Sequence, residues 1–400
     1  MHGDLSIKII GVGGGGMSAA SGLVDRVQNA VCIAMDTDES ALLSAKAHEK
    51  ILLGKSVTRS ASAGGDAEIA AKVLQADIDL IKNSVSASDI VFITASLGGA
   101  TGSVIAPAAA KIAKQAGAIV ISFCTLPFSF EGAQKCAFAR KTMEQMANIC
   151  DMAVALPDDE MLPNSQSNLK EALESASRCA RCAIAAVCDM LAKTGLINID
   201  FGALKNLFKE KLSEKYLFAY ASSKAENKVE DLLKKLKNFP ALKSGFAADR
   251  ASKLIACISC SSDTSIQEIK DVLAGIAETF SDTAEVIFGA VFDESRKGEV
   301  EVLAMGLAKG PQAQEQESKP KLELPTHEPE EKKAKTQLRR EKISSKSESP
   351  QRERQSEFNF VDVELKRGFF EDTEPNIYGR EDLDVPTFMR KKIKIQLKKI

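Results

Sequence analysis

A run of glycines near the start of this 400-residue sequence constrains the fold more than any other feature. Gly11 is followed by Val12 and then by four adjacent glycines, Gly13–Gly16. The run comes directly after the apolar segment Ile7–Ile10 and before residues with helical apolar spacing. A glycine turn between a strand and a helix leaves backbone N–H groups free to hold phosphate beside the positive end of the helix dipole. We therefore expect an α/β nucleotide-binding domain.

Taken alone, this turn is compatible with more than one ligand. Gly11, Gly13 and Gly16 satisfy the Gly-x-Gly-x-x-Gly pattern, and Asp36 stands where dinucleotide enzymes keep a ribose-binding acid. An NAD-dependent Rossmann dehydrogenase is therefore a serious alternative. No Lys-Ser or Lys-Thr follows the glycines, which excludes a Walker A loop. A turn without any ligand is a third alternative, although four adjacent glycines have a conformational cost that packing seldom requires.

Short apolar runs alternate with helix-period segments over the first 157 residues. The expected strands are Ile7–Ile10, Ala30–Met35, Asp89–Ala95, Ala118–Cys124 and Met152–Leu156. Their apolar residues are continuous rather than alternating, which is typical of strands covered on both faces. The order predicts a Rossmann-type parallel sheet with helices on both sides, and we assign residues 1–167 to this nucleotide-binding domain.

A long helix and a second domain follow. Apolar residues recur at spacings of three and four between Asn168 and Lys193, and Asn168 with Glu171 makes a capping-box pattern. We assign 168–200 to this central helix and the turn after it, which would bridge two domains. Mixed strand and helix patterns over 201–309 indicate an α+β second domain. Its strands are expected near 216–221, 253–259, 284–292 and 299–305, and its helices near 229–236 and 266–279.

The composition changes abruptly after Gly310. Residues 310–375 are rich in Pro, Gln, Glu, Lys, Ser and Arg, so we expect a disordered linker. Apolar residues return within 376–400, which predicts a short partner-docking peptide. The basic end, 390–400, is either a solvated tail or a segment attracted to an anionic membrane surface or a partner.

Charge, hydropathy and cysteine usage narrow the class of protein. The formal net charge of −2 gives no field that attracts nucleic acid, and we expect no such partner. Neither a signal-peptide pattern nor about 18 consecutive apolar residues are present, so we expect a cytoplasmic chain without a membrane span. The pairs Cys179/Cys182 and Cys257/Cys260 resemble half of a zinc signature. The second pair lies on an expected strand, where residues i and i+3 point to opposite faces, so we predict no metal site.

A second glycine-rich turn separates the alternatives. Ser96–Ser103 reads Ser-Leu-Gly-Gly-Ala-Thr-Gly-Ser and stands between the third expected strand and another helix, with Pro107 expected in the first helical turn. Two such turns at one edge of a sheet can clasp a polyphosphate from both sides, whereas a dehydrogenase needs only one.

The second turn and its surroundings resemble the tubulin/FtsZ family. The turn is similar to the family's Gly-Gly-Gly-Thr-Gly-Thr-Gly signature. Asp36–Asp38 resembles its Asn-Thr-Asp, Ala63–Ile69 its Ala-Gly-Ala-Asn-Pro-Glu-Ile, and Thr125–Gly132 its Thr-x-Pro-Phe-x-Phe-Glu-Gly. These motifs stand in the family's order over residues 7–307, so the chain resembles the bacterial cell-division members, with a divergent nucleotide site.

The resemblance implies a tubulin-like fold and a subunit that binds GTP or GDP with Mg²⁺. It also implies head-to-tail assembly into protofilaments of the division ring and GTP hydrolysis at subunit interfaces. The implied nucleotide-binding residues are Gly13, Gly14, Gly15, Gly16, Ser18, Gly98, Gly99, Ala100, Thr101, Gly102, Glu131, Lys135 and Arg178. Gly195–Phe201 resembles the loop that one subunit inserts into its neighbour's pocket, which makes Asn198 and Asp200 the implied catalytic residues.

The end of the chain resembles the family's C-terminal peptide, which docks membrane tethers and spatial regulators. The implied docking residues are Asp384, Val385, Pro386, Phe388, Met389 and Arg390. The resemblance therefore implies a cytoplasmic protein located at the midcell division ring.

Several positions depart from the family's pattern. Ala203 replaces the second acid of the Asn-x-Asp-Phe-x-Asp loop, which predicts slow hydrolysis, because a carboxylate that helps to activate water contributes ~10²–10⁴ in rate. Ala100 replaces a glycine and Lys135 an arginine, and a count along the long helix puts Leu173 and Arg178 at base-reading positions. These departures motivate an alternative function, that of a non-hydrolysing structural or regulatory paralogue.

Overall fold

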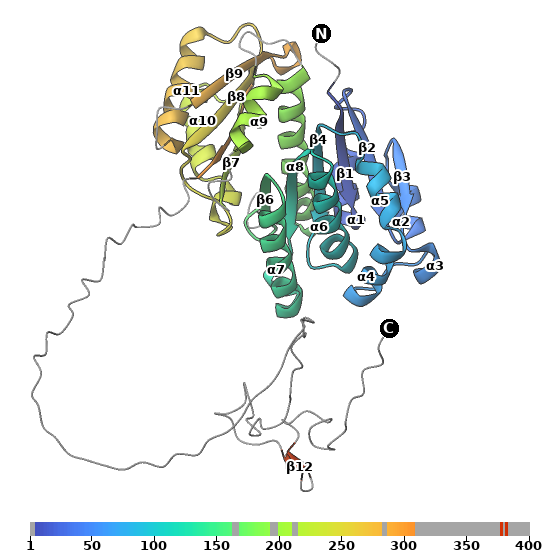
Figure 1. The fold of residues 1–400 in the computed structure, drawn as a ribbon. Helices are drawn as coiled ribbons and strands as arrows, with labels where there is room; N and C mark the ends of the chain where they lie inside the picture. Colours follow the sequence, from blue (N-terminus) through green and yellow to red (C-terminus); the bar gives the residue numbers. More distant parts are fainter. Residues whose placement is uncertain are drawn as a thin grey trace, which may run out of the picture. The chain divides into compact units, whose positions relative to one another are not determined.

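The computed structural model describes residues 5–161, 168–192, 199–209, 215–281 and 286–308, together with 377–378 and 381–382. The chain divides into two compact units, Met1–Lys319 and Pro320–Ile400. The first unit contains two sheets, which lie on either side of the long helix α8 (Leu169–Ala192) (Figure 1).

The first sheet has six parallel strands in the order β3-β2-β1-β4-β5-β6. The strands are β1 (Ile7–Val12), β2 (Ala30–Asp36), β3 (Glu49–Leu52), β4 (Ile90–Ser96), β5 (Ile119–Leu126) and β6 (Met152–Pro157). The predicted Rossmann-type parallel sheet is thus confirmed. Strand β3 was not expected, because this four-residue edge strand is only partly buried and lacks a continuous apolar run.

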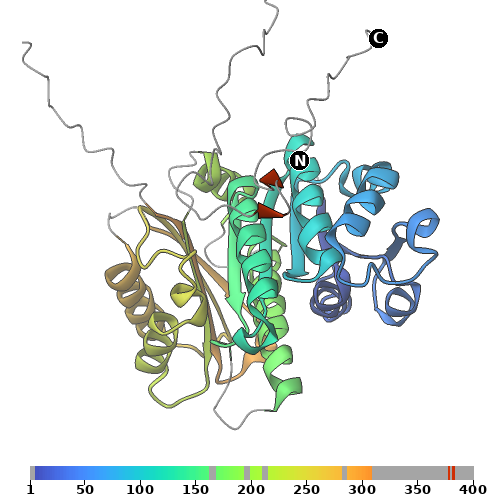
Figure 2. The same ribbon diagram turned by 90° about the horizontal axis from the view of Figure 1, so that it is seen from below.

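Helices cover both faces of this sheet (Figure 2). Helices α1 (Gly13–Ser21) and α8 lie on one face, where Ile9 and Phe92 join their core. The opposite face is covered mainly by α6 (Ala100–Gln115) and α7 (Ala133–Ile149), and Ile10 and Ile93 point to that side. The remaining helices of this domain are α2 (Glu39–Ser44), α3 (Lys55–Thr58), α4 (Ala67–Ala76) and α5 (Ile78–Val85), with the 3-10 turn η1 (Ser129–Glu131).

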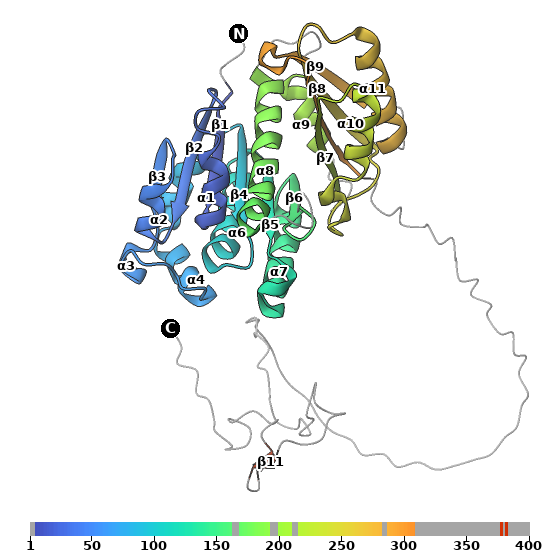
Figure 3. The same cartoon turned by 180° about the vertical axis from the view of Figure 1, so that it is seen from behind.

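The second sheet has four strands in the order β7-β10-β8-β9, with β10 antiparallel to both neighbours and β8 parallel to β9. Its strands are β7 (Tyr216–Ser223), β8 (Lys253–Cys260), β9 (Val286–Phe292) and β10 (Val300–Leu307). Helices α10 (Lys228–Lys237) and α11 (Ile266–Phe280) pack on one face, whereas α8 contacts the other (Figure 3). This mixed sheet confirms the predicted α+β domain, which also contains α9 (Phe201–Lys209).

Helix α8 joins the two sheets in one hydrophobic core. Its predicted capping box is present, since Asn168 Oδ1 accepts the N–H of Glu171 at 2.9 Å and the Glu171 carboxylate accepts the N–H of Asn168 at 3.3 Å. Ala183 and its neighbours on α8 are buried in the same core as Phe123 of β5 and Phe218 of β7, whose rings meet edge-on at 5.3 Å. The first domain therefore fixes the position of the second through direct apolar contact.

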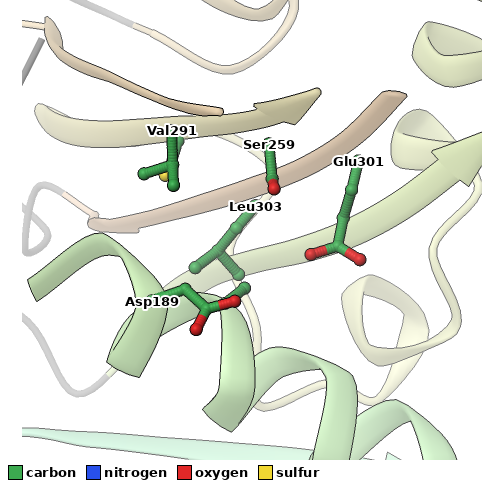
Figure 4. Close-up of a pocket in the computed structure, with 7 residues that line it drawn as sticks. Asp189, Ser259, Val291, Glu301 and Leu303 are labelled. Carbon is green, nitrogen blue, oxygen red and sulfur yellow. The ribbon is translucent and has the colours of Figure 1, made fainter. Parts of the chain in front are cut away.

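The contact between α8 and the second sheet is polar at one end. Asp189 of α8, Ser259 of β8 and Glu301 of β10 line a cavity of about 10 Å³ (Figure 4). Asp189 pairs with Arg26 at 2.9 Å, and Glu301 accepts from Arg296 at 2.6 Å and from the Tyr220 hydroxyl at 2.7 Å. Burial raises the pKa of Glu301 and Arg296 opposes that effect. Asp189 is thus paired with the first domain, whereas Glu301 is paired within the second domain.

The expected tail is described only in part. Ile377–Tyr378 (β11) and Glu381–Asp382 (β12) form a short antiparallel pair. The expected linker 310–375 and the docking residues 384–390 lie outside the described residues, as does the expected domain boundary at 167. Among the helices that the structure does describe, none has the length and apolarity that crossing a bilayer requires.

Candidate nucleotide site

Both glycine-rich turns lie at the carboxyl edge of the first sheet, because β1 and β4 are neighbours in parallel register. Helix α1 begins at Gly13, directly after β1, and α6 begins at Ala100. Neither helix start has a side-chain cap: the N-cap residues are Val12 and Gly99. The first N–H groups of both helices are therefore left for an anion, which the helix dipoles also favour.

The second turn is shorter than expected. Thr101 and Gly102 are wound into the first turn of α6, so Pro107 lies inside the helix rather than in its first turn. The prediction for Pro107 was therefore wrong. The earlier helix start places the N–H groups of the motif itself at the positive end of the dipole.

Glycine is required in the first turn for two different reasons. Gly13 adopts a φ of 71°, in the left-handed region that favours glycine. A Cβ on Gly16 would overlap the carbonyl oxygen of Thr94, because α1 crosses closely over β4. Gly14 has open space around it instead, so its missing side chain leaves room for a ligand.

A cavity of about 370 Å³ lies between the two turns. The Asp36–Asp38 turn and residues of the 62–65 segment also line it. Of the predicted nucleotide-binding residues, it brings together Gly13, Gly14, Gly15, Gly99, Ala100, Thr101, Gly102 and Lys135. The starts of two helices and one lysine line this cavity together with the carboxylates of Asp36 and Asp38, which suits a polyphosphate that carries a cation.

A second cavity, of about 600 Å³, shares Gly14, Gly15 and Ser96 with the first. Its other lining residues are Ser18, Thr125, Asp158, Lys170, Leu173, Glu174 and Ser177. The joined cavities have the size and the mixed polar and apolar lining of a ligand site. The lining of the first cavity suits phosphates, and the second cavity is large enough for a nucleoside.

Four predicted binding residues lie outside the described lining of both cavities: Gly16, Gly98, Glu131 and Arg178. The Arg178 side chain is exposed, and Ser177 lines the cavity instead. Residues four apart share a helix face, so the partner of Leu173 on this face is Ser177. The role of Arg178 therefore stays a prediction, and Ser177 is the residue that lines the cavity beside Leu173.

Glu131 and Gly98 both contact Lys135, which lines the first cavity. Glu131 accepts the N–H of Phe128 at 2.9 Å and forms an ion pair with Lys135. Gly98, with a φ of 96°, lies against the Lys135 side chain, where an added Cβ would approach Lys135 Cγ to 2.8 Å. These contacts hold the lysine at the first cavity.

Asp36 adds a buried acid to the first cavity. It is 4% exposed, and its Oδ1 accepts the N–H of Thr37 at 2.7 Å. Burial raises the pKa of Asp36, and the backbone hydrogen bonds oppose that effect. An acid beside phosphates suits Mg²⁺, which proteins bind through one or two carboxylates together with the phosphate oxygens.

Asp158 is a site residue that the sequence reasoning missed. It follows β6, is 5% exposed, and its Oδ1 has no hydrogen-bond partner. Burial, and then the charges of Glu131 and Asp159, raise the pKa of Asp158 to about 7. Its place at the carboxyl end of a core strand was the signal that could have identified it.

Of the two implied catalytic residues, only Asp200 lies within the described part of the chain. Asn198 lies outside the described residues. Asp200 precedes α9, and its Oδ1 accepts the N–H of Ala203 at 2.7 Å, so it caps that helix. Asp200 is also outside the described lining of both cavities.

Two family models match the chain. The model described as "Tubulin/FtsZ family, GTPase domain" matches residues 6–166, and that described as "FtsZ family, C-terminal domain" matches residues 217–308. The first match contains both glycine turns, and the second contains β8, β9, β10 and all of β7 except its first residue.

Solved structures of two protein types are similar to the chain. An FtsZ dimer from M. jannaschii is 28% identical, with a TM-score of 0.69, and the match covers 76% of this chain and 88% of that one. CetZ1 from Haloferax volcanii, a GDP-bound monomer, is 19% identical with a TM-score of 0.63, over 76% and 94% of the two chains. CetZ2 from the same organism, a GTPγS-bound protofilament, is 22% identical with a TM-score of 0.58, over 76% and 93%. The CetZ matches show likeness of fold alone.

Proposed function

The chain belongs to the tubulin/FtsZ family, and from this premise we propose that it is an FtsZ-like cytoskeletal subunit that binds GTP or GDP with Mg²⁺ and polymerises into protofilaments. Its proposed role is in the cell-division ring, where it hydrolyses GTP slowly at subunit interfaces. The dehydrogenase alternative is not retained, because the GTPase-domain match contains the glycine turn that suggested it.

One observation carries the nucleotide-binding part of this proposal. Two helices, α1 and α6, start without side-chain caps at the same cavity, and α8 continues the lining on the far side of Gly14 and Gly15. Uncapped helix starts supply unpaired N–H donors, and Lys135 supplies a positive charge. This donor set favours a polyphosphate over an uncharged ligand.

Self-association is supported by the surface next to the site. Phe130 is 73% exposed and stacks on Phe128 with a ring separation of 4.9 Å. A large exposed aromatic ring beside a ligand site is typical of a protein interface. We propose that this face meets another copy of the chain, which inserts Asn198 and Asp200 at the bound nucleotide.

Slow hydrolysis follows from the proposed loop chemistry. Ala203 offers no carboxylate, and Asp200 Oδ1 already accepts a backbone hydrogen bond. These observations also favour a second candidate function, a non-hydrolysing structural or regulatory paralogue that binds nucleotide and assembles with an active relative.

The tail completes the proposal. Residues 376–400 would dock membrane tethers and regulators through Asp384, Val385, Pro386, Phe388, Met389 and Arg390. Such docking would place the protein in the cytoplasm, at the midcell division ring.

Phosphate release by the purified protein, with GTP and Mg²⁺ over a range of protein concentrations, tests the proposal. Light scattering follows filament formation in parallel. Activity that rises steeply above a critical protein concentration is the expected result. Filaments without phosphate release would favour the non-hydrolysing paralogue, and the absence of both filaments and GTP binding would contradict the proposal.

A further inference from the structure

The second cavity contains a buried carboxyl group that the protein leaves incompletely hydrogen-bonded. Asp158 lines this cavity, is 5% exposed, and its Oδ1 has no partner. The backbone around it is fixed, because its N–H donates to the carbonyl oxygen of Leu126 at 3.0 Å. A buried polar atom without a partner costs free energy, so a carboxyl group retained in this state beside a ligand-sized cavity points to an interaction of that group with the ligand.

The charges around Asp158 are mostly negative. Glu131 and Asp159 raise its pKa and Lys135 lowers it, whereas burial has the largest effect. Lys135 is already paired with Glu131, and Asp159 accepts the N–H of Ser129 at 2.9 Å. Lys170 and Glu174 line the same cavity from α8, and Glu174 is paired with Arg181 at 2.5 Å. None of these contacts gives the Asp158 carboxylate a cation of its own.

A bound nucleotide would make the ionised form of Asp158 still less favourable. The nucleoside would displace water from the cavity, and the phosphates would bring further negative charge into the adjoining one. A protonated carboxyl group avoids both costs. It also presents an O–H donor to an acceptor atom of the nucleoside, which a carboxylate cannot do.

We propose that Asp158 binds the nucleoside in its protonated form, so that the protein takes up a proton with the nucleotide and its affinity falls as pH rises above neutrality. This inference rests on the proposed nucleotide binding and adds proton linkage to that site. Asp158 is thus a binding residue whose carboxyl group is either protonated or ionised, and the cellular pH sets the proportion of the two forms.

Isothermal titration with GDP tests the inference, because GDP is not consumed during the measurement. The titration is run at pH 7.5 in two buffers with different ionisation enthalpies, and the dissociation constant is measured between pH 6 and pH 8.5. For the wild-type protein we expect uptake of up to about one proton per GDP and an affinity that falls by up to about tenfold per pH unit above pH 7. This measurement of protons taken up by the wild-type protein does not depend on the folding of any variant.

Asp158→Asn replaces the ionisable carboxyl group with an amide of nearly the same shape, which does not titrate in this pH range. The GDP affinity of this variant should depend less on pH, and the variant should take up correspondingly fewer protons. Ionisation of GDP itself contributes equally to both proteins, so it cancels when the two proton counts are subtracted. Asp159→Asn is the matched control and should keep the wild-type dependence, with a midpoint shifted slightly to lower pH. Equal profiles and equal proton counts for wild type and Asp158→Asn would overturn this inference alone. Absence of GDP and GTP binding by both folded proteins at every pH would overturn the proposed function, and the inference with it.

Discussion

Oδ1 of Asp200 accepts a 2.7 Å hydrogen bond from the backbone N–H of Ala203, the residue that replaces the expected second acid. Asp200 therefore already has a structural role as the N-cap of α9. Any role in hydrolysis has to be separated from this cap by the choice of substitution.

Asp200→Asn keeps the cap, because an asparagine oxygen accepts the same hydrogen bond, but it removes the carboxylate. We expect GTP hydrolysis in the polymer to fall by ~10² or more. Asp200→Ala should lose the same activity and, in addition, about 1 kcal/mol of unfolding free energy. Phosphate release, GTP affinity and thermal unfolding measured together distinguish the two effects. An unchanged rate in Asp200→Asn would remove Asp200 from the catalytic mechanism.

Ala203→Asp would restore a second acid to the loop. An acid in the first turn of α9 is compatible with the helix dipole, so the fold should tolerate the change. We expect phosphate release above the critical concentration to rise by ~10². Ala203→Asn, which has the same shape without the charge, is the control. A rate that stays at the wild-type value would show that the missing acid does not limit hydrolysis.

Gly14→Ala and Gly16→Ala separate ligand binding from packing. A Cβ at Gly14 meets open space, so Gly14→Ala should keep the stability of the fold and lower GTP affinity by at least about tenfold. A Cβ at Gly16 would collide with the Thr94 carbonyl oxygen, so Gly16→Ala should lower the unfolding free energy by ~1–3 kcal/mol. Thermal unfolding and binding of a fluorescent GTP analogue report the two quantities. Equal loss of stability in both variants would contradict this assignment.

The stability of the unliganded protein should depend on pH through Asp158. Its pKa is raised from 3.8 to about 7, so the folded state binds more protons than the unfolded state between these values. Stability is therefore lost as pH rises from about 4 to about 7, by at most about 4 kcal/mol from this group. Asp158→Asn should lack this loss and be more stable than wild type at pH 8. Urea unfolding at pH 5 and pH 8 measures the difference, and parallel behaviour of the two proteins would contradict it.

Deletion of residues 382–400 should leave polymerisation intact and abolish recruitment to the division ring. The expected docking residues are removed, whereas both sheets and both cavities are untouched. A fluorescent fusion in dividing cells and a sedimentation assay of the purified protein provide the two readouts. Unchanged localisation of the shortened protein would refute the docking role.

The first domain was largely predictable because its strands are apolar on both faces. The run at 7–10 and the run at 118–124 each correspond to a strand, β1 and β5, that is almost fully buried. Strand β3 gave no such signal, since it pairs at the sheet edge with two of its residues exposed. Sequence patterns of this kind report burial, and they fail where an element is held mainly by backbone pairing.

The candidate site was predictable at the glycine turns and less so elsewhere. The turns are local features, and their neighbours in sequence line the cavity. Asp158 and Ser177 reach the second cavity from β6 and α8, two elements that only the folded chain brings together. The burial that raises the pKa of Asp158 is likewise a property of the fold.

The uncapped starts of α1 and α6 also bear on how long the protein lasts in a cell. A nucleotide at 100 times its dissociation constant would add about 2.7 kcal/mol to the folded state. When GTP and GDP are depleted, that contribution is lost and the unfolded fraction exposed to proteases increases. The abundance of this subunit would then follow the total pool of nucleotide in the cell without any dedicated sensor.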